Sequence, residues 1–175
     1  IYKIPLFGKF QGDNFLLVYA AMKELGIDKK TIKNGLLNVK WPGRFEIFIR
    51  NPLVILDGAH NEDSSLKLVE NLKSISNKED VCFLTSILED KDIGKILKNF
   101  SSVADKIVYT SLKDYHRGLG AKEMYDRDIY FDNRKYYENM VEAYNEAKKS
   151  KIVVVAGSFY LLCEFRRVIE SENRL

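Results

Sequence analysis

The order of apolar and polar positions divides the chain into two regions. From residue 42 onward, short apolar runs alternate with longer segments in which apolar residues recur every three or four positions. This order is typical of strands that are each followed by an amphipathic helix. It predicts an α/β fold with a mainly parallel sheet and helices on both faces. Residues 1–41 instead predict two short helices, which are too small to form a core alone.

The second region is expected to contain six strands and five helices. Strands are predicted at 46–50, 53–56, 80–86, 106–110, 129–131 and 151–156, and helices at 61–75, 90–100, 120–126, 134–149 and 159–170. The helix predicted at 134–149 is the most regular of these, with Tyr137, Met140, Val141, Tyr144 and Ala147 on its apolar stripe.

The first region predicts helices at about 14–25 and 29–39. Asp13 and Asp28 precede them as candidate N-caps, and Gly26 is placed to end the first helix. The apolar face of the first helix is wide, so we expect other parts of the protein to cover it.

A polar cluster follows the strand predicted at 53–56, where the next helix begins. In open α/β sheets, ligands bind beyond the carboxyl ends of the strands, and helix N-termini attract anions. An unpaired carboxylate at Asp57 would be costly, so it is expected to bind a ligand, to cap the helix, or both. Arg44 offers a rigid fork to phosphate, although it could instead cap a strand edge or pair with Glu46. His60 is either a hydrogen-bonded structural residue or a ligand contact.

Composition narrows the class of protein. The 175 residues are 46% apolar and 30% charged, and 28 basic against 25 acidic residues give a net charge of +3, too small to indicate nucleic-acid binding. No apolar stretch approaches the roughly 20 residues that cross a bilayer, and no signal peptide is visible, so we expect a cytoplasmic protein without a membrane partner. Cys82 and Cys163 both lie in apolar runs and are expected to be buried free thiols.

Several motifs resemble one known family. The segment PGRFE (Pro42 to Glu46), followed by ILDGAHN (Ile55 to Asn61), resembles the folylpolyglutamate synthase and dihydrofolate synthase family, a branch of the Mur ligase superfamily. Arg44 and Asp57 lie 13 positions apart, a spacing similar to that of the family.

Other segments extend the resemblance along the chain. The Asp90-Lys91-Asp92 segment is similar to a family DKD, and Ala156 to Tyr160 resembles its terminal GSxY motif. Residues Gln11 to Asn14 resemble the family's HQxxNA motif, but Phe10 and Phe15 stand where His and Ala are expected. The resemblance implies that residues 1–41 are the end of a central ATPase domain. Residues 42–175 would be the complete, Rossmann-like C-terminal domain.

The activity implied by the resemblance is ATP-dependent amide formation. A folate carboxylate would be phosphorylated to an acyl phosphate and then attacked by the amine of glutamate. The implied cofactors are ATP and Mg²⁺, with the metal ligands outside this chain. The sequence contains no GxxxxGK[ST] loop and does not begin with Met, so we expect a piece of a longer protein that is inactive without its N-terminal ATPase domain.

The resemblance also assigns roles to single residues. Arg44 would contact the ATP phosphates, Asp57 the ribose hydroxyls, and His60 the nucleotide or a phosphate. Asn14 would lie on the adenine side, unless it is only a first-turn helix residue. Ser158 would bind substrate or cap the last helix. No residue is assigned a catalytic role.

Two other classes of function remain open at this stage. One is a stand-alone, non-catalytic α/β module that binds a nucleotide or a partner. The other is a dinucleotide-binding oxidoreductase, for which Gly118 to Ala121 supplies only GxG, without the later glycine. His116 has no motif around it and is interpreted as a loop residue. The choice between dihydropteroate and folylpolyglutamate substrates is also open.

Overall fold

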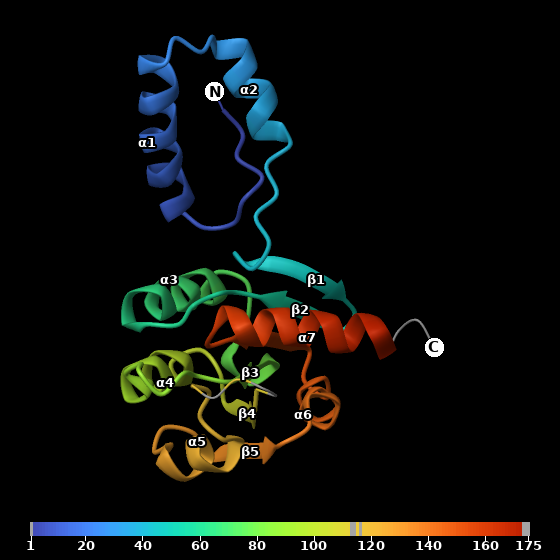
Figure 1. Ribbon diagram of the computed structural model, residues 1–175. Helices are drawn as coiled ribbons and strands as arrows, with labels where there is room; N and C mark the ends of the chain where they lie inside the picture. Colours follow the sequence, from blue (N-terminus) through green and yellow to red (C-terminus); the bar gives the residue numbers. More distant parts are fainter. Residues whose placement is uncertain (1, 113–114, 116, 173–175) are drawn as a thin grey trace.

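The computed structural model has an α/β domain and a helical N-terminal region that stands beyond one edge of its sheet (Figure 1). It describes residues 2–112, 115 and 117–172. The two parts are joined by the chain near Trp41 and also touch through side chains. The ring of Phe7 stacks on that of Phe45, with centroids 4.4 Å apart. The Lys67 ammonium lies 5.9 Å from the centre of the Phe10 ring.

A six-stranded sheet forms the centre of the α/β domain. Its strands are β1 (Glu46–Arg50), β2 (Leu53–Leu56), β3 (Val81–Thr85), β4 (Lys106–Thr110), β5 (Asn133–Tyr137) and β6 (Ile152–Ala156). They lie in the order β1-β2-β6-β3-β4-β5. Only the β1–β2 pair is antiparallel, and the other four pairs are parallel. The predicted fold class is therefore confirmed.

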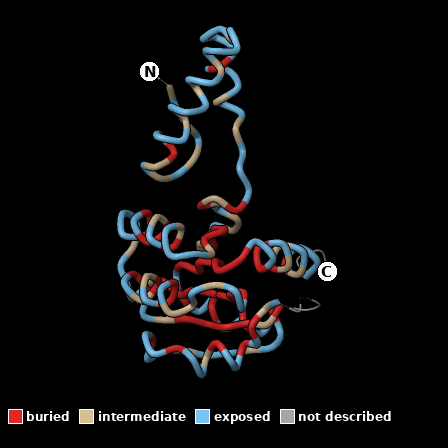
Figure 2. Tube along the Cα trace, turned by 60° about the vertical axis from the view of Figure 1, so that its left-hand side comes forward, coloured by how far each residue is buried: buried red, intermediate tan, exposed pale blue. Residues whose placement is uncertain are grey.

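Helices cover both faces of the sheet. One face carries α3 (Glu62–Lys73), α4 (Ile93–Ser101) and α5 (Ala121–Arg127), and the other carries α6 (Met140–Ala147) and α7 (Phe159–Glu172). A short 3₁₀ helix, Lys78–Asp80, precedes β3. Because both faces are covered, the inner strands are mainly apolar runs. In β6, Val154 packs on the first side, and Val153 and Val155 pack on the second. The buried positions concentrate in this layer (Figure 2).

Two helices make up the N-terminal region, α1 (Phe10–Glu24) and α2 (Lys29–Leu37). Asp28 caps α2 as predicted, because its carboxylate accepts the N–H groups of Lys30 and Thr31. Gly26 ends α1 with φ +73°, and the N–H of Ile27 bonds back to the Met22 carbonyl. The prediction that Asp13 caps α1 is wrong, since the helix already begins at Phe10.

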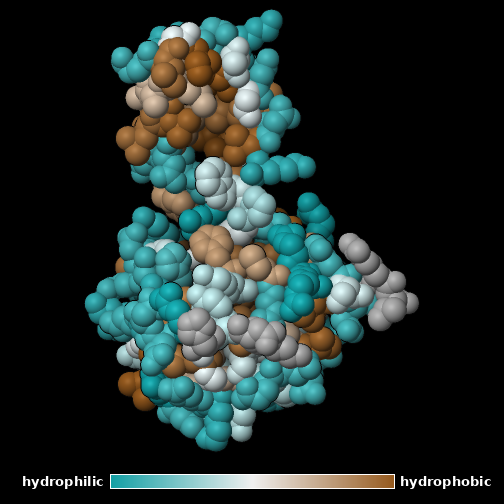
Figure 3. All heavy atoms as spheres, viewed as in Figure 1, coloured by the Kyte–Doolittle hydropathy of each residue, from teal (hydrophilic) through white to brown (hydrophobic). Residues whose placement is uncertain are grey.

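The apolar face of α1 is not covered within the described residues, contrary to expectation. Leu16, Leu17 and Val18 are 62%, 74% and 48% exposed. In the space-filling view, hydrophobic atoms gather over this helical region (Figure 3). The ring of Tyr2 covers another side of α1, with centroids 5.2 Å from Phe15 and 5.4 Å from Tyr19. The exposed leucines and valine therefore form an apolar face that the described residues leave open.

The segment before α6 departs most from the prediction. Residues 129–131 form no strand, and Ile129 is 81% exposed. The strand is instead β5 (Asn133–Tyr137), which overlaps the start of the helix predicted at 134–149, and α6 begins only at Met140. Two features favour a strand over a helix at residues 133–137, despite the helical periodicity. The chain pairs in parallel with β4, and Asn139 caps α6 by accepting the N–H groups of Val141 and Glu142.

The two cysteines differ in exposure. Cys82 is buried on β3, as expected, and burial raises the pKa of its thiol to about 12. Cys163 is exposed, contrary to expectation, because Leu162 and Phe165 of α7 face the sheet and position 163 turns away from it. Within the described part of the chain, no helix is both long and apolar enough to cross a membrane.

Candidate functional site

The hairpin of β1 and β2 brings Arg44 and Asp57 to the same end of the sheet. Glu46 of β1 pairs with Leu56 of β2, so the residues just before β1 lie beside those just after β2. The Asp57 carboxylate accepts the N–H of Phe45 on one oxygen and that of Ala59 on the other, each at 2.9 Å. Asp57 therefore fastens the Arg44–Phe45 turn to the end of β2.

Asp57 is 8% exposed, and its environment has opposing effects. Burial raises the pKa of the carboxyl group, whereas the two backbone N–H groups and the charge of Arg44 lower it, with a net shift upward. Phe45 has φ +47°, in the left-handed region that residues other than glycine rarely adopt. The hydrogen bond from Phe45 to Asp57 supports this backbone conformation.

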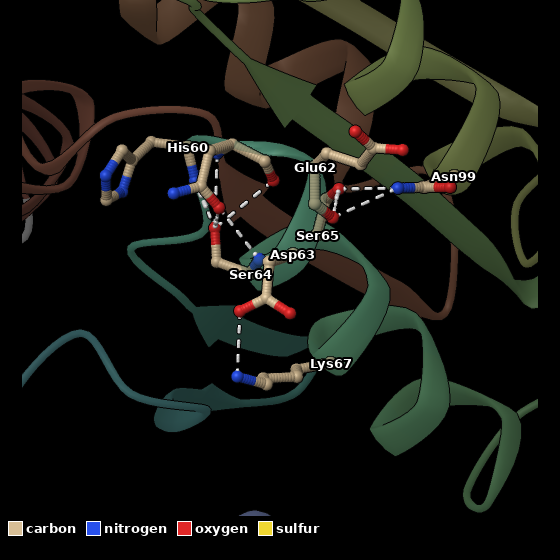
Figure 4. Close-up of polar contacts among 8 residues, drawn as sticks. His60, Glu62, Asp63, Ser64, Ser65, Lys67 and Asn99 are labelled. Atoms are coloured by element: carbon tan, nitrogen blue, oxygen red, sulfur yellow. Dashed lines mark hydrogen bonds and ion pairs between the residues drawn. The ribbon is translucent and has the colours of Figure 1, made fainter.

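Helix α3 is capped by Asn61, and the proposed alternative role of Asp57 as its N-cap is wrong. The Asn61 side chain accepts the Ser64 N–H at 2.9 Å, and the Ser64 hydroxyl accepts the Asn61 N–H at 3.2 Å (Figure 4). These two bonds form a capping box. Asp57 instead accepts its hydrogen bonds within the loop that precedes the helix.

Arg44 does not pair with Glu46, which was one alternative for its role. Glu46 instead accepts two hydrogen bonds from Arg166 of α7, at 2.7 and 2.8 Å, and one from the Gly43 N–H at 2.8 Å. The Arg44 guanidinium carbon lies 5.1 Å from the centre of the Phe159 ring. Among the described carboxylates, none forms an ion pair with Arg44, so its fork is left to bind an anion.

Phe159, the first residue of α7, lies in the middle of this site. Its ring covers Gly58 so closely that a Cβ at that position would come within 2.2 Å of the ring. The imidazole of His60 is 6.1 Å from it, between centroids. Sequence reasoning found the segment that contains Phe159 but missed its contact with Arg44, which no spacing in the chain indicates.

His60 is oriented by the loop that carries it. Its Nδ1 lies 2.7 Å from the Gly58 carbonyl oxygen, so Nδ1 carries the proton that is donated. In the neutral ring, Nε2 is then the atom that can accept from a ligand. The His60 backbone N–H donates to the Ser64 hydroxyl, and the ring points away from that cluster (Figure 4).

The N-termini of α3 and α7 differ in how well they would receive an anion. The first turn of α3 contains Glu62 and Asp63. Glu62 pairs with Lys95 at 2.7 Å. Asp63 pairs with Lys67 at 2.8 Å (Figure 4). The first turn of α7 contains no acidic residue. Carboxylates at an N-terminus already complement the helix dipole and repel a phosphate. An anion therefore fits the α7 side of the site, next to Arg44, better than the α3 side.

Three other residues singled out in the sequence have different outcomes. Ser158 is buried and its hydroxyl accepts the Leu161 N–H at 3.1 Å, so it caps α7. Asn14 is exposed on α1 and donates to the Gln11 side chain at 3.1 Å, and no described contact joins it to Arg44 or Asp57. His116 lies outside the described residues.

A cavity of about 520 Å³ opens beside Arg44, between the N-terminal segment and the start of β1. It is lined by Pro5, Leu6, Phe7, Val39, Lys40, Trp41, Pro42, Arg44, Phe45, Glu46 and Ile47. Its walls are mainly apolar, with Lys40, Arg44 and Glu46 as charged groups. Since Glu46 is paired with Arg166, the remaining charges are positive, which suits a ligand that combines an apolar ring with an anionic part. No group of three or more metal-binding side chains is found among the described residues.

Comparison with known proteins identifies the family. The Mur ligase, glutamate ligase domain matches residues 43–159, which include Arg44, Asp57, His60 and Phe159. This chain belongs to the Mur ligase family. The match covers β1 to the start of α7, and therefore the whole sheet of this Mur ligase domain.

Relatives within the family are folylpolyglutamate and dihydrofolate synthases, as the motifs predicted. The dihydrofolate synthase/folylpolyglutamate synthase of Bacillus subtilis is 31% identical over 94% of the chain. The chain spans only 40% of that relative's length. The resemblance noted in the sequence is thus confirmed, for the C-terminal part of these enzymes.

Solved structures agree with this assignment. Folylpolyglutamate synthase of Mycobacterium tuberculosis, complexed with ADP and AMPPCP, has a TM-score of 0.86 at 25% identity, over 94% of this chain and 41% of its own. The bifunctional enzyme of Yersinia pestis, complexed with AMPPNP and a Mn ion, has a TM-score of 0.82 at 26% identity, over 97% of this chain and 41% of its own.

Proposed function

We propose that this chain is the C-terminal part of an ATP-dependent ligase that adds glutamate to a folate through an acyl phosphate. The observation that carries the proposal is the Arg44 guanidinium, held at the carboxyl end of the sheet and left without a described carboxylate partner. The names of the relatives and the nucleotides bound to the solved neighbours support it.

In this proposal Arg44 binds the phosphates of ATP presented by the rest of the enzyme. Phosphoryl transfer depends mainly on positioning and on stabilising charge spread over phosphate oxygens, which a fixed guanidinium fork can do. Asp57 keeps one lone pair on each oxygen for the ribose hydroxyls, and His60 reaches the nucleotide through Nε2. Asn14 serves the adenine side, and Ser158 acts as a helix cap.

We further propose that residues 1–41 are the end of a central ATPase domain and that residues 42–175 form the C-terminal domain. The exposed apolar residues of α1 support this boundary, because a helix with such a face is stable only when another body covers it. The nucleotide would then lie between the two domains, in the cavity beside Arg44. A P-loop and the Mg²⁺ ligands would belong to the preceding domain.

The test compares the chain alone with the chain fused behind the N-terminal part of the Bacillus subtilis relative. With ATP, glutamate and either dihydropteroate or a folate, we expect turnover from the fusion and none from the chain alone. In the fusion, Arg44→Ala should lower kcat/KM by about 10²- to 10³-fold, because one charge-stabilising group is lost. Arg50→Ala, an exposed arginine at the far end of β1, is the matched control and should change it little.

Two results would contradict the proposal. Turnover by the chain alone would show that it needs no separate ATPase domain. Full activity of the Arg44→Ala fusion would remove the proposed phosphate contact. ADP binding by the chain, together with a fusion that stays inactive, would instead favour a non-catalytic nucleotide-binding module.

A further inference from the structure

The ring of Phe159 is placed against a charge rather than within the core. It is 39% exposed, although it is the first residue of a helix whose Leu161, Leu162 and Phe165 are buried. One neighbour is the backbone of Gly58, and another is the Arg44 guanidinium at 5.1 Å. Gly43 lies against the same ring, since a Cβ there would be 3.3 Å from it. Phe159 therefore contacts two loops of the site at once.

The contact with Arg44 has the geometry of a cation–π interaction. A guanidinium within about 6 Å of an aromatic centroid is attracted by the negative face of the ring. This contact limits the rotation of a long side chain that has many rotamers in water. Because the ring accepts no hydrogen bond from the plane of the fork, the guanidinium N–H groups can still bind an anion.

The backbone on either side keeps both partners in place. Asp57 binds the Phe45 N–H and so fixes the turn that carries Arg44. The hydroxyl of Ser158 caps α7 and so fixes the first residue of the helix. The Gly58 N–H donates to the Gly43 carbonyl at 2.7 Å, which joins the two loops beneath the ring.

We propose that Phe159 is a positioning residue, whose ring holds the Arg44 guanidinium in the orientation that receives the nucleotide phosphates. The inference rests on the proposed function, because it takes Arg44 as the phosphate contact. It adds that the orientation of Arg44 depends on the aromatic face of Phe159 and not only on the volume of the side chain.

Phe159→Leu is the informative substitution. Leucine fills much of the space over Gly58 but has no π face, so packing is largely kept while the attraction to Arg44 is lost. We expect the affinity of the fusion described above for ADP, measured by isothermal titration calorimetry, to fall by about 3- to 30-fold. The Arg44 Nε–H resonance should also move, because it loses the ring current of Phe159. This second measurement needs no ligand.

A double-mutant cycle separates positioning from structure. In the Arg44→Ala background, Phe159→Leu should weaken ADP binding no further, because the group that it positions is gone. The matched control is Tyr125→Leu, which removes a similar pair, with Arg134 at 4.9 Å, near the opposite edge of the sheet. It should leave both the ADP affinity and the Arg44 resonance unchanged.

The outcomes distinguish the two proposals. If Arg44→Ala leaves the ADP affinity of the fusion unchanged, or the unsubstituted fusion does not bind ADP, the proposed phosphate contact is overturned, and the positioning role of Phe159 is overturned with it. If Arg44→Ala weakens binding but Phe159→Leu does not, or the two losses add, only the positioning role of Phe159 is overturned. An unchanged Arg44 Nε–H resonance in Phe159→Leu would also overturn it.

Discussion

Gly58 and Phe159 are matched in shape at the centre of the site. The ring lies where any side chain at position 58 would have to go. Gly58 does not have a positive φ, so the need for glycine here arises from the neighbouring ring and not from the backbone conformation. The glycine of the DGAHN segment is thus required by the ring of Phe159, which lies far along the chain.

Gly58→Ala should therefore destabilise the protein. The new Cβ would lie 2.2 Å from Phe159, and forcing the ring out should lower the free energy of unfolding by about 1–3 kcal/mol. Urea unfolding measures the change. Gly120→Ala is the control, because a Cβ there meets nothing within 4 Å, and its effect should stay within about 0.5 kcal/mol. Equal effects of the two substitutions would contradict the close packing described for Gly58.

Single residues were predictable where a motif marks them. The PGRFE and DGAHN motifs marked Arg44 and Asp57 as candidates, and the hairpin register places both at one end of the sheet. The hydrogen bond from Phe45 to Asp57 was not predictable, because a backbone N–H has no signature in the sequence. The partner of Glu46 was missed for a related reason: Arg166 lies far along the chain and only the fold brings it near.

At the scale of elements, β5 and α6 are held together by one glutamate. Glu146 of α6 accepts hydrogen bonds from Lys135 of β5 at 2.8 Å and from Lys149 at 2.7 Å. The Lys135 and Lys149 ammonium groups lower the pKa of the Glu146 carboxyl group to about 2. This part of the chain was predicted as one long helix, so the link between the two elements could not be foreseen.

The stabilisation from Glu146 should depend on pH. Because its pKa is lowered by folding, the contribution is present above the ordinary value of 4.5 and is lost as the pH falls toward 2. The lysines are exposed, so Glu146→Gln should cost only about 0.5–1 kcal/mol at neutral pH and nothing near pH 2. Urea unfolding at the two pH values tests this. The exposed Glu70→Gln should change stability little at either pH, and a Glu146→Gln cost that persists in acid would contradict the prediction.

Most other elements could be predicted from the periodicity of apolar residues, because each is buried in a way that this periodicity reflects. The strands β2, β3, β4 and β6 are apolar runs covered on both faces, and such runs leave few alternatives in an alternating chain. The β5 edge differs, since its residues are mostly half-buried or exposed and its tyrosines also fit a helical stripe. There, pairing with β4 decided the structure, and pairing is not visible in a local window.

At the scale of the whole molecule, the α/β domain has a well-covered apolar core, whereas the N-terminal region leaves apolar side chains exposed. All the large buried clusters lie in the α/β domain, whereas α1 presents leucines to solvent. A patch of this kind is a common site of association. The chain as given should therefore associate with itself as its concentration rises.

Leu17→Lys should reduce that self-association. It places a charge in the middle of the exposed α1 face, and it should leave the free energy of unfolding within about 0.5 kcal/mol because Leu17 is already exposed. Sedimentation velocity at several concentrations measures the effect. Leu66→Lys is the control, since Leu66 is a half-exposed leucine on α3 of the α/β domain. Equal self-association in both variants and in the unsubstituted chain would contradict the prediction.

The position of β6 has a consequence for how the protein matures. This strand lies between β2 and β3, yet it is the last of the six to be synthesised. On the ribosome, β2 therefore has no parallel neighbour until residue 156 has emerged, and the two halves of the sheet stay unpaired until this last of the six strands is made. Nascent chains that stop short of β6 would expose strand edges and become substrates for chaperones.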